Sequence, residues 1–288
     1  LLVFVLSAVK SVQGEFKRTT IMGKLSGKKI TFDIYLPENY RKKGFGYPVI
    51  YSLHGRGGFY KNGGAFHPPI KKAIADGVLP QVIAVYPDGT KNSWYADSKD
   101  RTILIETHII REIIPWIDTN YNTKSSRGFR VIQGFSMGGY GASLLAVKFP
   151  ELFSVCINYD GGMWNWEDMT SKSRKWQPVA PVLFDNDKIY YESNSSPWKF
   201  ANLNKDKIKG QLQFRTLVGS LGLRLQKWRN HLNSLEIEMD YVDTECRHDL
   251  KCLHEKAGDG SFQLMAEQFA KAMASKSKTS EELKAEGK

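Results

Sequence analysis

Hydrophobic residues recur along the chain in two rhythms, one typical of strands and one typical of helices. Residues 28–40 alternate apolar and polar positions, as a half-exposed antiparallel strand does. Residues 47–55 and 79–89 instead contain continuous apolar runs that end in Gly or Pro-Asp-Gly, the pattern of strands buried on both faces of a parallel sheet. Residues 106–121 place isoleucines at helical spacing, which predicts a helix.

The alternation of strands and helices continues through the rest of the chain. Further strands are predicted at 129–135, 152–162, 211–220 and 236–244, and further helices at 138–150, 224–235 and 261–275. This order predicts an α/β fold, a mostly parallel central sheet with helices on both faces. No repeat and no linker rich in Pro, Gly or Ser divides the chain, so we predict one domain over residues 15–275 and a polar tail over 276–288.

The first 14 residues form a short apolar run that ends in small residues. The run is too short to span a bilayer comfortably. Val12 and Gly14 suit the −3 and −1 positions of a secretory signal peptide cut before Glu15. We therefore expect a signal peptide over 1–14 and a secreted protein, extracellular or periplasmic. A buried N-terminal strand or helix is the alternative, and no later segment is apolar enough to cross a membrane.

The composition is that of an ordinary globular domain and excludes few classes of protein. Hydrophobic residues make up 41% of the 288 residues and charged residues 25%, which is ordinary for a globular domain. The net charge is +11, but the basic residues are spread along the chain without an Arg-rich tract, so no nucleic-acid partner is expected. The charge would attract an acidic polysaccharide or a cell wall without specificity. Nothing in the sequence predicts the oligomeric state.

The three cysteines do not form a disulfide-rich pattern. Cys156 lies in an apolar run and is expected in the core. Cys246 and Cys252 could close a small loop in an oxidising compartment, but their spacing alone leaves the pairing open.

The strongest chemical signal is the sequence around Ser136. A hydrophobic strand leads into Gly134-Phe135-Ser136-Met137-Gly138, and a helix rich in small residues follows. A G-x-S-x-G sequence at a strand-to-helix turn exposes the serine Oγ, and glycines fit where a Cβ would clash. A phosphate-binding loop would need a Lys or G-x-G-x-x-G spacing, and neither fits here. We therefore predict that Ser136 is a nucleophile.

A serine nucleophile needs N–H donors for the oxyanion that develops on its substrate. Met137 begins the predicted helix, so its N–H points toward developing negative charge. The second donor is predicted in the His-Gly-Arg-Gly-Gly sequence at the end of the strand at 47–55. We favour the amide of Arg56, with that of Gly57 as the alternative.

The general base is predicted to be His248, which follows the last predicted strand and precedes a helix. His254 is a competitor, but its spacing places it within that helix, and His231 lies in the middle of another. No H-E-x-x-H sequence and no dense His/Asp cluster is present, so no metal or cofactor is expected.

The acid that would orient His248 is the least determined residue. The segment 214–224, which contains its usual place after the penultimate strand, holds no Asp or Glu. Asp160 ends the strand at 152–162, one strand from Ser136, and is the favoured candidate. The alternatives are a weakened dyad without an acid, or one of three residues near His248, namely Asp243, Glu245 and Asp249.

Four segments carry a family resemblance, namely 47–58, 92–98, 106–123 and 127–153. They resemble the esterase D-like family of α/β-hydrolases, which includes secreted feruloyl and acetyl-xylan esterases, S-formylglutathione hydrolases and mycolyltransferases. The resemblance runs from about residue 28 to 255. It implies an α/β-hydrolase fold without a large lid domain.

The resemblance also assigns roles to individual residues. It places the nucleophile at Ser136, the base at His248 and the oxyanion donors at Arg56 and Met137. The family's acid would fall at Gly222, so this sequence departs from the family there.

Four aromatic residues fall in loops at predicted carboxyl ends of strands, namely Trp94, Tyr95, Trp164 and Trp166. Such rings stack on sugars or phenolic acids, although packing of a loop-rich rim explains them equally well. With the export signal, the resemblance implies a secreted serine esterase whose small-molecule or polysaccharide ester substrate resembles feruloyl or acetyl xylan. The alternatives are an acyltransferase to a sugar hydroxyl and a non-catalytic carbohydrate-binding relative.

Overall fold

The computed structural model describes residues 14–58, 60–171 and 179–286. The expected signal peptide lies outside these residues apart from Gly14, as do the last two residues of the expected tail. Within the described ranges, no helix combines the length and the apolar character that crossing a membrane requires.

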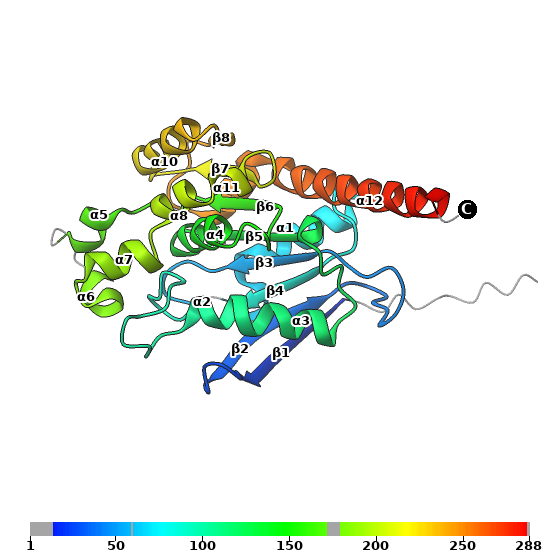
Figure 1. Ribbon diagram of the computed structural model, residues 1–288, viewed down its shortest axis with the longest axis horizontal. Helices are drawn as coiled ribbons and strands as arrows, with labels where there is room; N and C mark the ends of the chain where they lie inside the picture. The colour runs from blue at the N-terminus through cyan, green and yellow to red at the C-terminus, as the bar shows by residue number, and fades with distance from the viewer. Residues whose placement is uncertain (1–13, 59, 172–178, 287–288) are drawn as a thin grey trace, which may run out of the picture.

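Eight strands form one sheet in the order β1-β2-β4-β3-β5-β6-β7-β8 (Figure 1). The strands are β1 (Glu15–Met22), β2 (Lys29–Leu36), β3 (Val49–Leu53), β4 (Ile83–Pro87), β5 (Arg130–Phe135), β6 (Val155–Tyr159), β7 (Gln213–Val218) and β8 (Met239–Asp243). Strands β3 to β8 are mutually parallel, whereas β1 and β2 form an antiparallel hairpin on one edge. The predicted mostly parallel sheet is therefore confirmed, and β1 is an additional strand that the hydrophobic pattern did not indicate.

Helices cover both faces of the sheet. They are α1 (His67–Ala75), α2 (Ile105–Thr107), α3 (Ile114–Asn120), α4 (Met137–Lys148), α5 (Trp166–Thr170), α6 (Val179–Phe184), α7 (Lys188–Asn194), α8 (Pro197–Leu203), α9 (Lys205–Ile208), α10 (Gly222–Ser234), α11 (Leu250–Ala257) and α12 (Gly260–Glu286). Short 3-10 segments are η1 (Lys61–Phe66) and η3 (Arg127–Phe129), and the π-helical segment η2 (His108–Ile113) joins α2 to α3.

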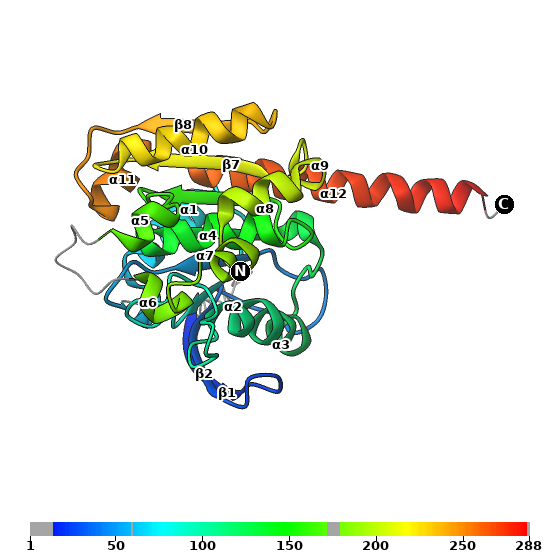
Figure 2. The same ribbon diagram turned by 60° about the vertical axis from the view of Figure 1, so that its left-hand side comes forward.

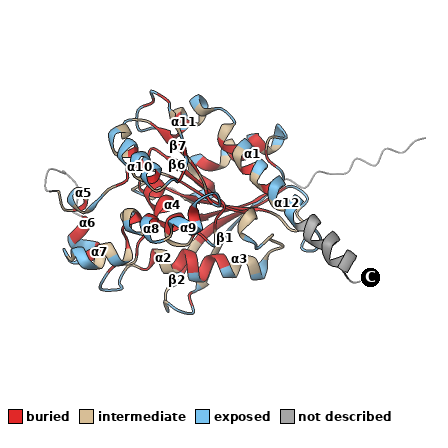
Figure 3. Cartoon of the chain, turned by 45° about the horizontal axis from the view of Figure 1, so that its top comes forward, coloured by how far each residue is buried: buried red, intermediate tan, exposed pale blue. Residues whose placement is uncertain are grey.

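Two apolar clusters form the core, one on each face of the sheet. Figure 3 shows the buried residues, in red, concentrated in the sheet and on the helices beside it. Helices α3, α4, α8 and α10 contribute to one cluster, and α1, α11 and α12 contribute to the other. Neighbouring residues of each central strand point to opposite faces, so Ile83 and Val85 join the first cluster while Ala84 and Tyr86 join the second. This two-sided burial explains the continuous apolar runs in the sequence.

Two segments differ from the pattern-based expectation. The region from about 162 to 200, for which the hydrophobic pattern predicts no helix, contains the short helices α5 to α7 and most of α8. Helix α12 does not end at residue 275 but continues to Glu286 and extends beyond the rest of the domain (Figures 1 and 2). Ala, Lys and Glu have high helix propensity, so a polar segment without Pro can prolong a helix without burying an apolar face.

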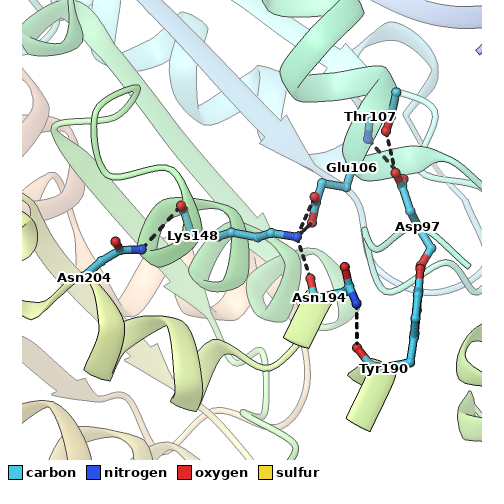
Figure 4. A network of polar contacts seen from close by, with 7 residues as sticks. All are labelled: Asp97, Glu106, Thr107, Lys148, Tyr190, Asn194 and Asn204. Carbon is cyan, nitrogen blue, oxygen red and sulfur yellow. Dashed lines mark hydrogen bonds and ion pairs between the residues drawn. The ribbon is translucent and has the colours of Figure 1, made fainter. Parts of the chain in front are cut away.

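Lys148, the last residue of α4, ties this helix to two other segments (Figure 4). Its Nζ donates to the two carboxylate oxygens of Glu106 at 2.6 and 2.8 Å and to the carbonyl oxygen of Asn194 at 2.5 Å. Asp97 accepts hydrogen bonds from the amide and the hydroxyl of Thr107, next to Glu106. The network thus fixes the C-terminal end of α4 against α2 and α7.

The Glu106 carboxyl makes stability depend on pH. Burial raises the pKa of Glu106 from 4.5 to about 7, and the nearby Lys148 cation offsets only part of this effect. The folded protein therefore holds the Glu106 proton more tightly than the unfolded chain, so the free energy of unfolding falls as the pH rises from about 5 to about 8. We expect the wild type to lose about 2 kcal/mol more than Glu106→Gln over this range in urea denaturation. Equal losses in the two proteins would contradict this assignment.

Candidate active site

Ser136 occupies a sharp turn between β5 and α4. Its backbone has φ 56° and ψ −118°, a conformation that costs a non-glycine residue on the order of 1–3 kcal/mol. The turn is possible because a Cβ on Gly134 would lie 2.0 Å from the Gly138 carbonyl oxygen. A Cβ on Gly138 would likewise lie 2.0 Å from the Leu53 carbonyl oxygen. The two glycines of the G-x-S-x-G sequence are therefore required by backbone contact on both sides of the serine.

Ser136, His248 and Asp160 form a chain of hydrogen bonds. Ser136 Oγ lies 2.7 Å from His248 Nε2, and His248 Nδ1 lies 2.6 Å from Asp160 Oδ2. The His248 ring stacks on Phe135, with the ring centroids 4.6 Å apart. The structure therefore brings together the serine, the histidine and the favoured acid in the order that nucleophilic catalysis requires.

Asp160 directly follows β6 and is fully buried. Its Oδ1 accepts hydrogen bonds from the amides of Gly219 and Leu221, at 2.9 and 3.0 Å. These amides belong to the loop after β7, where the resemblance would have placed an acid. The loop thus supplies N–H donors to a carboxylate on the neighbouring strand, instead of supplying the carboxylate itself.

The alternative acids lie elsewhere. Asp249 is the N-cap of α11 and accepts from the Cys252 amide, and Asp243 accepts from the Glu245 amide. Among the described side chains, Asp160 is the acid hydrogen-bonded to His248. Adjacency of β5, β6 and β7 in the sheet explains this arrangement.

Gly219 was not singled out in the sequence, yet the site depends on its lack of a side chain. A Cβ at this position would lie 2.8 Å from the Arg247 carbonyl oxygen and 2.9 Å from Asp160 Oδ2. The sequence shows only a glycine near the end of the strand predicted at 211–220, because its neighbours, Arg247 and Asp160, come from two distant segments.

The loop after β3 lies against the nucleophile turn. A Cβ on Gly55 would lie 3.3 Å from the Cβ of Ser136, so the neighbouring Arg56 amide belongs to the surroundings of the serine. The Gly57 amide donates to the Lys91 carbonyl oxygen at 3.1 Å, which argues against the alternative donor. Arg56, and Met137 at the first position of α4, thus stay the proposed oxyanion donors.

His54 holds this loop in place rather than taking part in proton transfer. Its Nε2 accepts from the Gly89 amide at 2.9 Å, which leaves Nδ1 to donate to the Gly55 carbonyl oxygen at 2.7 Å. Burial lowers the pKa of His54, so the neutral ring is favoured. The sequence places His54 in the predicted oxyanion loop, but its contact with Gly89, 35 residues away, leaves no signal in the sequence.

A disulfide joins Cys246 to Cys252 and closes the short segment that carries His248. Cys156 is a buried free cysteine, in agreement with the sequence prediction. The catalytic candidate is therefore held between β8 and α11 by a covalent link as well as by its contact with Asp160.

Removing this disulfide should weaken both the fold and the site. We expect the Cys246→Ser/Cys252→Ser double variant to lose about 2 kcal/mol of unfolding free energy, because the short loop is no longer closed in the unfolded chain. We also expect kcat for ester hydrolysis to fall more than KM rises, since the His248 segment is less restrained. Wild type treated with reductant should match the double variant, and reductant should not change the double variant further. A double variant with wild-type stability and kcat would contradict this role.

The four aromatic candidates divide into two pairs. Tyr95 is completely buried and donates a hydrogen bond from its hydroxyl to the His54 carbonyl oxygen at 2.9 Å. Trp94 is only 5% exposed and packs on Trp164, with ring centroids 4.0 Å apart. The prediction that Tyr95 and Trp94 contact substrate is therefore corrected, because both lie in the packed interior behind the site.

Trp164 and Trp166 are half-buried and stay candidates for substrate contact. The Arg224 guanidinium lies 5.9 Å from the Trp164 ring centroid and pairs with Asp168 at 3.0 Å. Trp166 packs near Tyr191, with the ring centroids 5.5 Å apart.

The competing base, His254, lies in α11, as its spacing predicted. It packs among aromatic rings, 4.6 Å from the Tyr159 centroid, and burial lowers its pKa to about 4. Within the described residues, no group of three or more His, Cys, Asp or Glu side chains could hold a metal ion.

Comparisons with known proteins agree with this geometry. The model of the family described as "Putative esterase" matches residues 23–200. Two esterases of Mycobacterium tuberculosis strains are each 33% identical over 228 residues, which cover 66% of this chain and 49% of theirs. An endo-1,4-beta-xylanase/feruloyl esterase of Xylanibacter ruminicola is 32% identical over 165 residues, covering 54% of this chain and 23% of that protein. The chain thus spans about half, or less, of the length of these curated relatives.

Solved structures share the fold at lower identity. A ferulic acid esterase aligns with a TM-score of 0.72 and 18% identity, covering 89% of this chain and 99% of that one. An S-formylglutathione hydrolase of Staphylococcus aureus aligns with a TM-score of 0.71 and 14% identity, covering 88% and 99%. The α/β-hydrolase fold inferred from the sequence is thereby confirmed. Because the family match extends over more than half of the 288 residues, the chain belongs to this family of esterases.

Proposed function

We propose that the protein is a serine carboxylic-ester hydrolase that forms an acyl-enzyme on Ser136. The observation that carries the proposal is the continuous hydrogen-bond chain from Ser136 Oγ through His248 to Asp160. Membership of the esterase family supports the same reaction class.

In the first half of the reaction, His248 Nε2 takes the proton of Ser136 Oγ as the oxygen attacks the ester carbonyl. Asp160 accepts from Nδ1–H, which keeps Nε2 unprotonated before the attack and stabilises the imidazolium formed afterwards. The proposed donors to the oxyanion are the amides of Arg56 and Met137, the latter at the positive end of α4. Collapse of the tetrahedral intermediate expels the alcohol, which receives the proton from His248.

In the second half, water replaces the alcohol. His248 removes a proton from this water, which attacks the acyl carbonyl, and the departing Ser136 oxygen recovers the proton. His248 Nε2 thus acts as a base and then as an acid in each half of the reaction. The Ser136 proton leaves and returns across the 2.7 Å between Ser136 Oγ and this nitrogen.

The substrate that we propose is an acylated polysaccharide with feruloyl or acetyl groups, met outside the cytoplasm. The name of the Xylanibacter relative, an endo-1,4-beta-xylanase/feruloyl esterase, supports this class. The half-buried rings of Trp164 and Trp166 lie in the segment that follows Asp160 and offer surfaces for a sugar or a phenolic acyl group. The Cys246–Cys252 disulfide suits an oxidising compartment and supports export.

The proposal is tested by trapping the acyl-enzyme. The protein is mixed with feruloylated and with acetylated xylo-oligosaccharides, quenched early and analysed by intact-protein mass spectrometry, with Ser136→Ala as the control. We expect a mass increase equal to the acyl group on Ser136 and release of the free acid. Turnover without a labelled serine would contradict the mechanism, whereas transfer of the acyl group to an added sugar rather than to water would identify an acyltransferase.

A further inference from the structure

A hollow lies at the end of the sheet where the parallel strands begin, and Ser136 lies at the end where they finish. The volume of the hollow is about 700 Å³, and it is lined by Glu15, Lys17, Leu36, Pro37, Asn39, Tyr40, Arg41, Lys42, Asn120 and Tyr121. We call it the Tyr40 hollow. Leu36, the last residue of β2, pairs with Glu15. The preceding residue, Tyr35, pairs with Ala84 near the amino end of β4, so Leu36 lies at that end of the sheet. Ser136 follows the carboxyl end of β5, so the length of the parallel strands, about 17 Å for five residues, separates the two sites.

The aromatic part of the Tyr40 hollow is held in place by its neighbours. The Tyr40 hydroxyl accepts from the Asn122 amide at 2.8 Å, and its ring centroid lies 5.2 Å from that of Tyr47 and 6.1 Å from that of Tyr121. Tyr121 in turn contacts Trp116, at 5.9 Å between centroids. These tyrosines are half-buried, so the rings that line the hollow are already fixed. A ligand that binds there therefore loses little free energy to the ordering of these side chains.

Charge distinguishes what such a surface would bind. Lys17, Arg41 and Lys42 line the hollow against a single acid, Glu15. Lys17 pairs with Glu15 at 3.3 Å, whereas neither Arg41 nor Lys42 forms an ion pair with any side chain in the described part of the protein. Two exposed cations therefore lie beside aromatic rings and the exposed side-chain amides of Asn39 and Asn120. Asn120 Nδ2 already donates to the Trp116 carbonyl oxygen at 2.8 Å.

We propose that the Tyr40 hollow is a second binding site, separate from the catalytic site, for an oligosaccharide that carries uronate carboxylates. Aromatic rings and amide groups together suit a sugar ring, and the unpaired Arg41 and Lys42 suit its carboxylate. A concave site with fixed aromatic rings fits a discrete glycan better than a flat anionic surface does. A polymer held there would remain near the enzyme while Ser136 acts on other parts of it, which raises the local concentration of ester groups.

The experiment measures binding without turnover. The 288-residue chain with Ser136→Ala is titrated calorimetrically with oligogalacturonate, with neutral xylo-oligosaccharide and with anionic phospholipid vesicles. The Arg41→Gln/Lys42→Gln double change is then added and compared with Lys205→Gln/Lys207→Gln on α9, which removes the same charge from exposed positions. Asn39→Gly serves as a third variant, because glycine retains the left-handed backbone at φ 58° while removing the amide.

We expect oligogalacturonate to bind, and the Arg41/Lys42 change to weaken binding by about tenfold or more, since charge-assisted hydrogen bonds are lost. Asn39→Gly should weaken it less, and the α9 change should leave it within about twofold. In the Ser136 background, hydrolysis of a small soluble ester should be unaffected by the Arg41/Lys42 change, so failure here is distinguishable from failure of the proposed esterase activity. Equal weakening by the α9 change, equally strong binding of the neutral sugar, binding of vesicles alone, or no binding would overturn the proposal.

Discussion

Ser136→Ala is expected to lower kcat for ester hydrolysis by about 10⁶-fold. The variant lacks the oxygen that forms the acyl-enzyme, and no other described hydroxyl is hydrogen-bonded to His248. Residual hydrolysis would come from the oxyanion donors and from substrate binding alone, so KM should change little. Steady-state kinetics with a chromogenic acetate or ferulate ester provides the measurement.

The loss must be separated from any effect on folding. Alanine retains a Cβ at the strained φ of residue 136, so the thermal unfolding midpoint should stay close to that of the wild type. Ser126→Ala is a matched control, because Ser126 is exposed and makes no side-chain capping hydrogen bond at η3. Retention of more than a small percentage of wild-type activity by folded Ser136→Ala would assign the nucleophile elsewhere.

Asp160→Asn is expected to lower kcat by about 10⁴-fold, although the side chain keeps its shape. Oδ1 of Asp160 accepts two backbone hydrogen bonds, from Gly219 and Leu221, so the amide oxygen of Asn must take that position. The Asn NH₂ group then faces His248 Nδ1 and can only donate to it. The ring is forced into the tautomer with a proton on Nε2, which cannot accept the proton of Ser136.

Asp243→Asn supplies the control for this prediction. Asp243 is exposed and lies five residues from His248 in sequence, and its carboxylate accepts from the Glu245 amide. We expect wild-type kcat for this variant. The opposite pattern, a large loss for Asp243→Asn and a small one for Asp160→Asn, would exclude the hydrogen-bond chain as the catalytic arrangement. Proton NMR of the His248 ring in Asp160→Asn would further show whether Nε2 carries the proton.

The sequence contained enough to predict most of the sheet and the nucleophile turn. Continuous apolar runs at β3, β4 and β5 arise from burial on both faces, and this signal is local. The G-x-S-x-G turn is also local, since Gly134 and Gly138 clear space for each other and for the preceding strand. By contrast, β1 is mostly exposed or half-exposed along its length, so its side chains carry no apolar pattern.

The sequence offered Asp160 as one candidate for the acid that orients His248, but it did not distinguish Asp160 from the alternatives. Asp160 and the amides that hold it are 59 and 61 residues apart in the chain, and a backbone donor leaves no trace in residue type. The prediction that Trp94 and Tyr95 contact substrate was wrong because burial of a loop residue is also not visible in residue type. Trp94 and Tyr95 both have positive φ, at 52° and 58°, a backbone conformation that their residue types do not indicate, and both rings are buried.

The loop after β7 has a consequence for protein design. It contributes to the catalytic chain only through the backbone amides of Gly219 and Leu221. Proton transfer therefore imposes no chemical requirement on the side chains of Ser220 in this loop and of Leu223, the second residue of α10, both of which are exposed. Provided that Gly219 is kept, libraries at these two positions can be searched for new properties while the proton relay stays intact. A triad whose acid stood in this loop would not allow that separation.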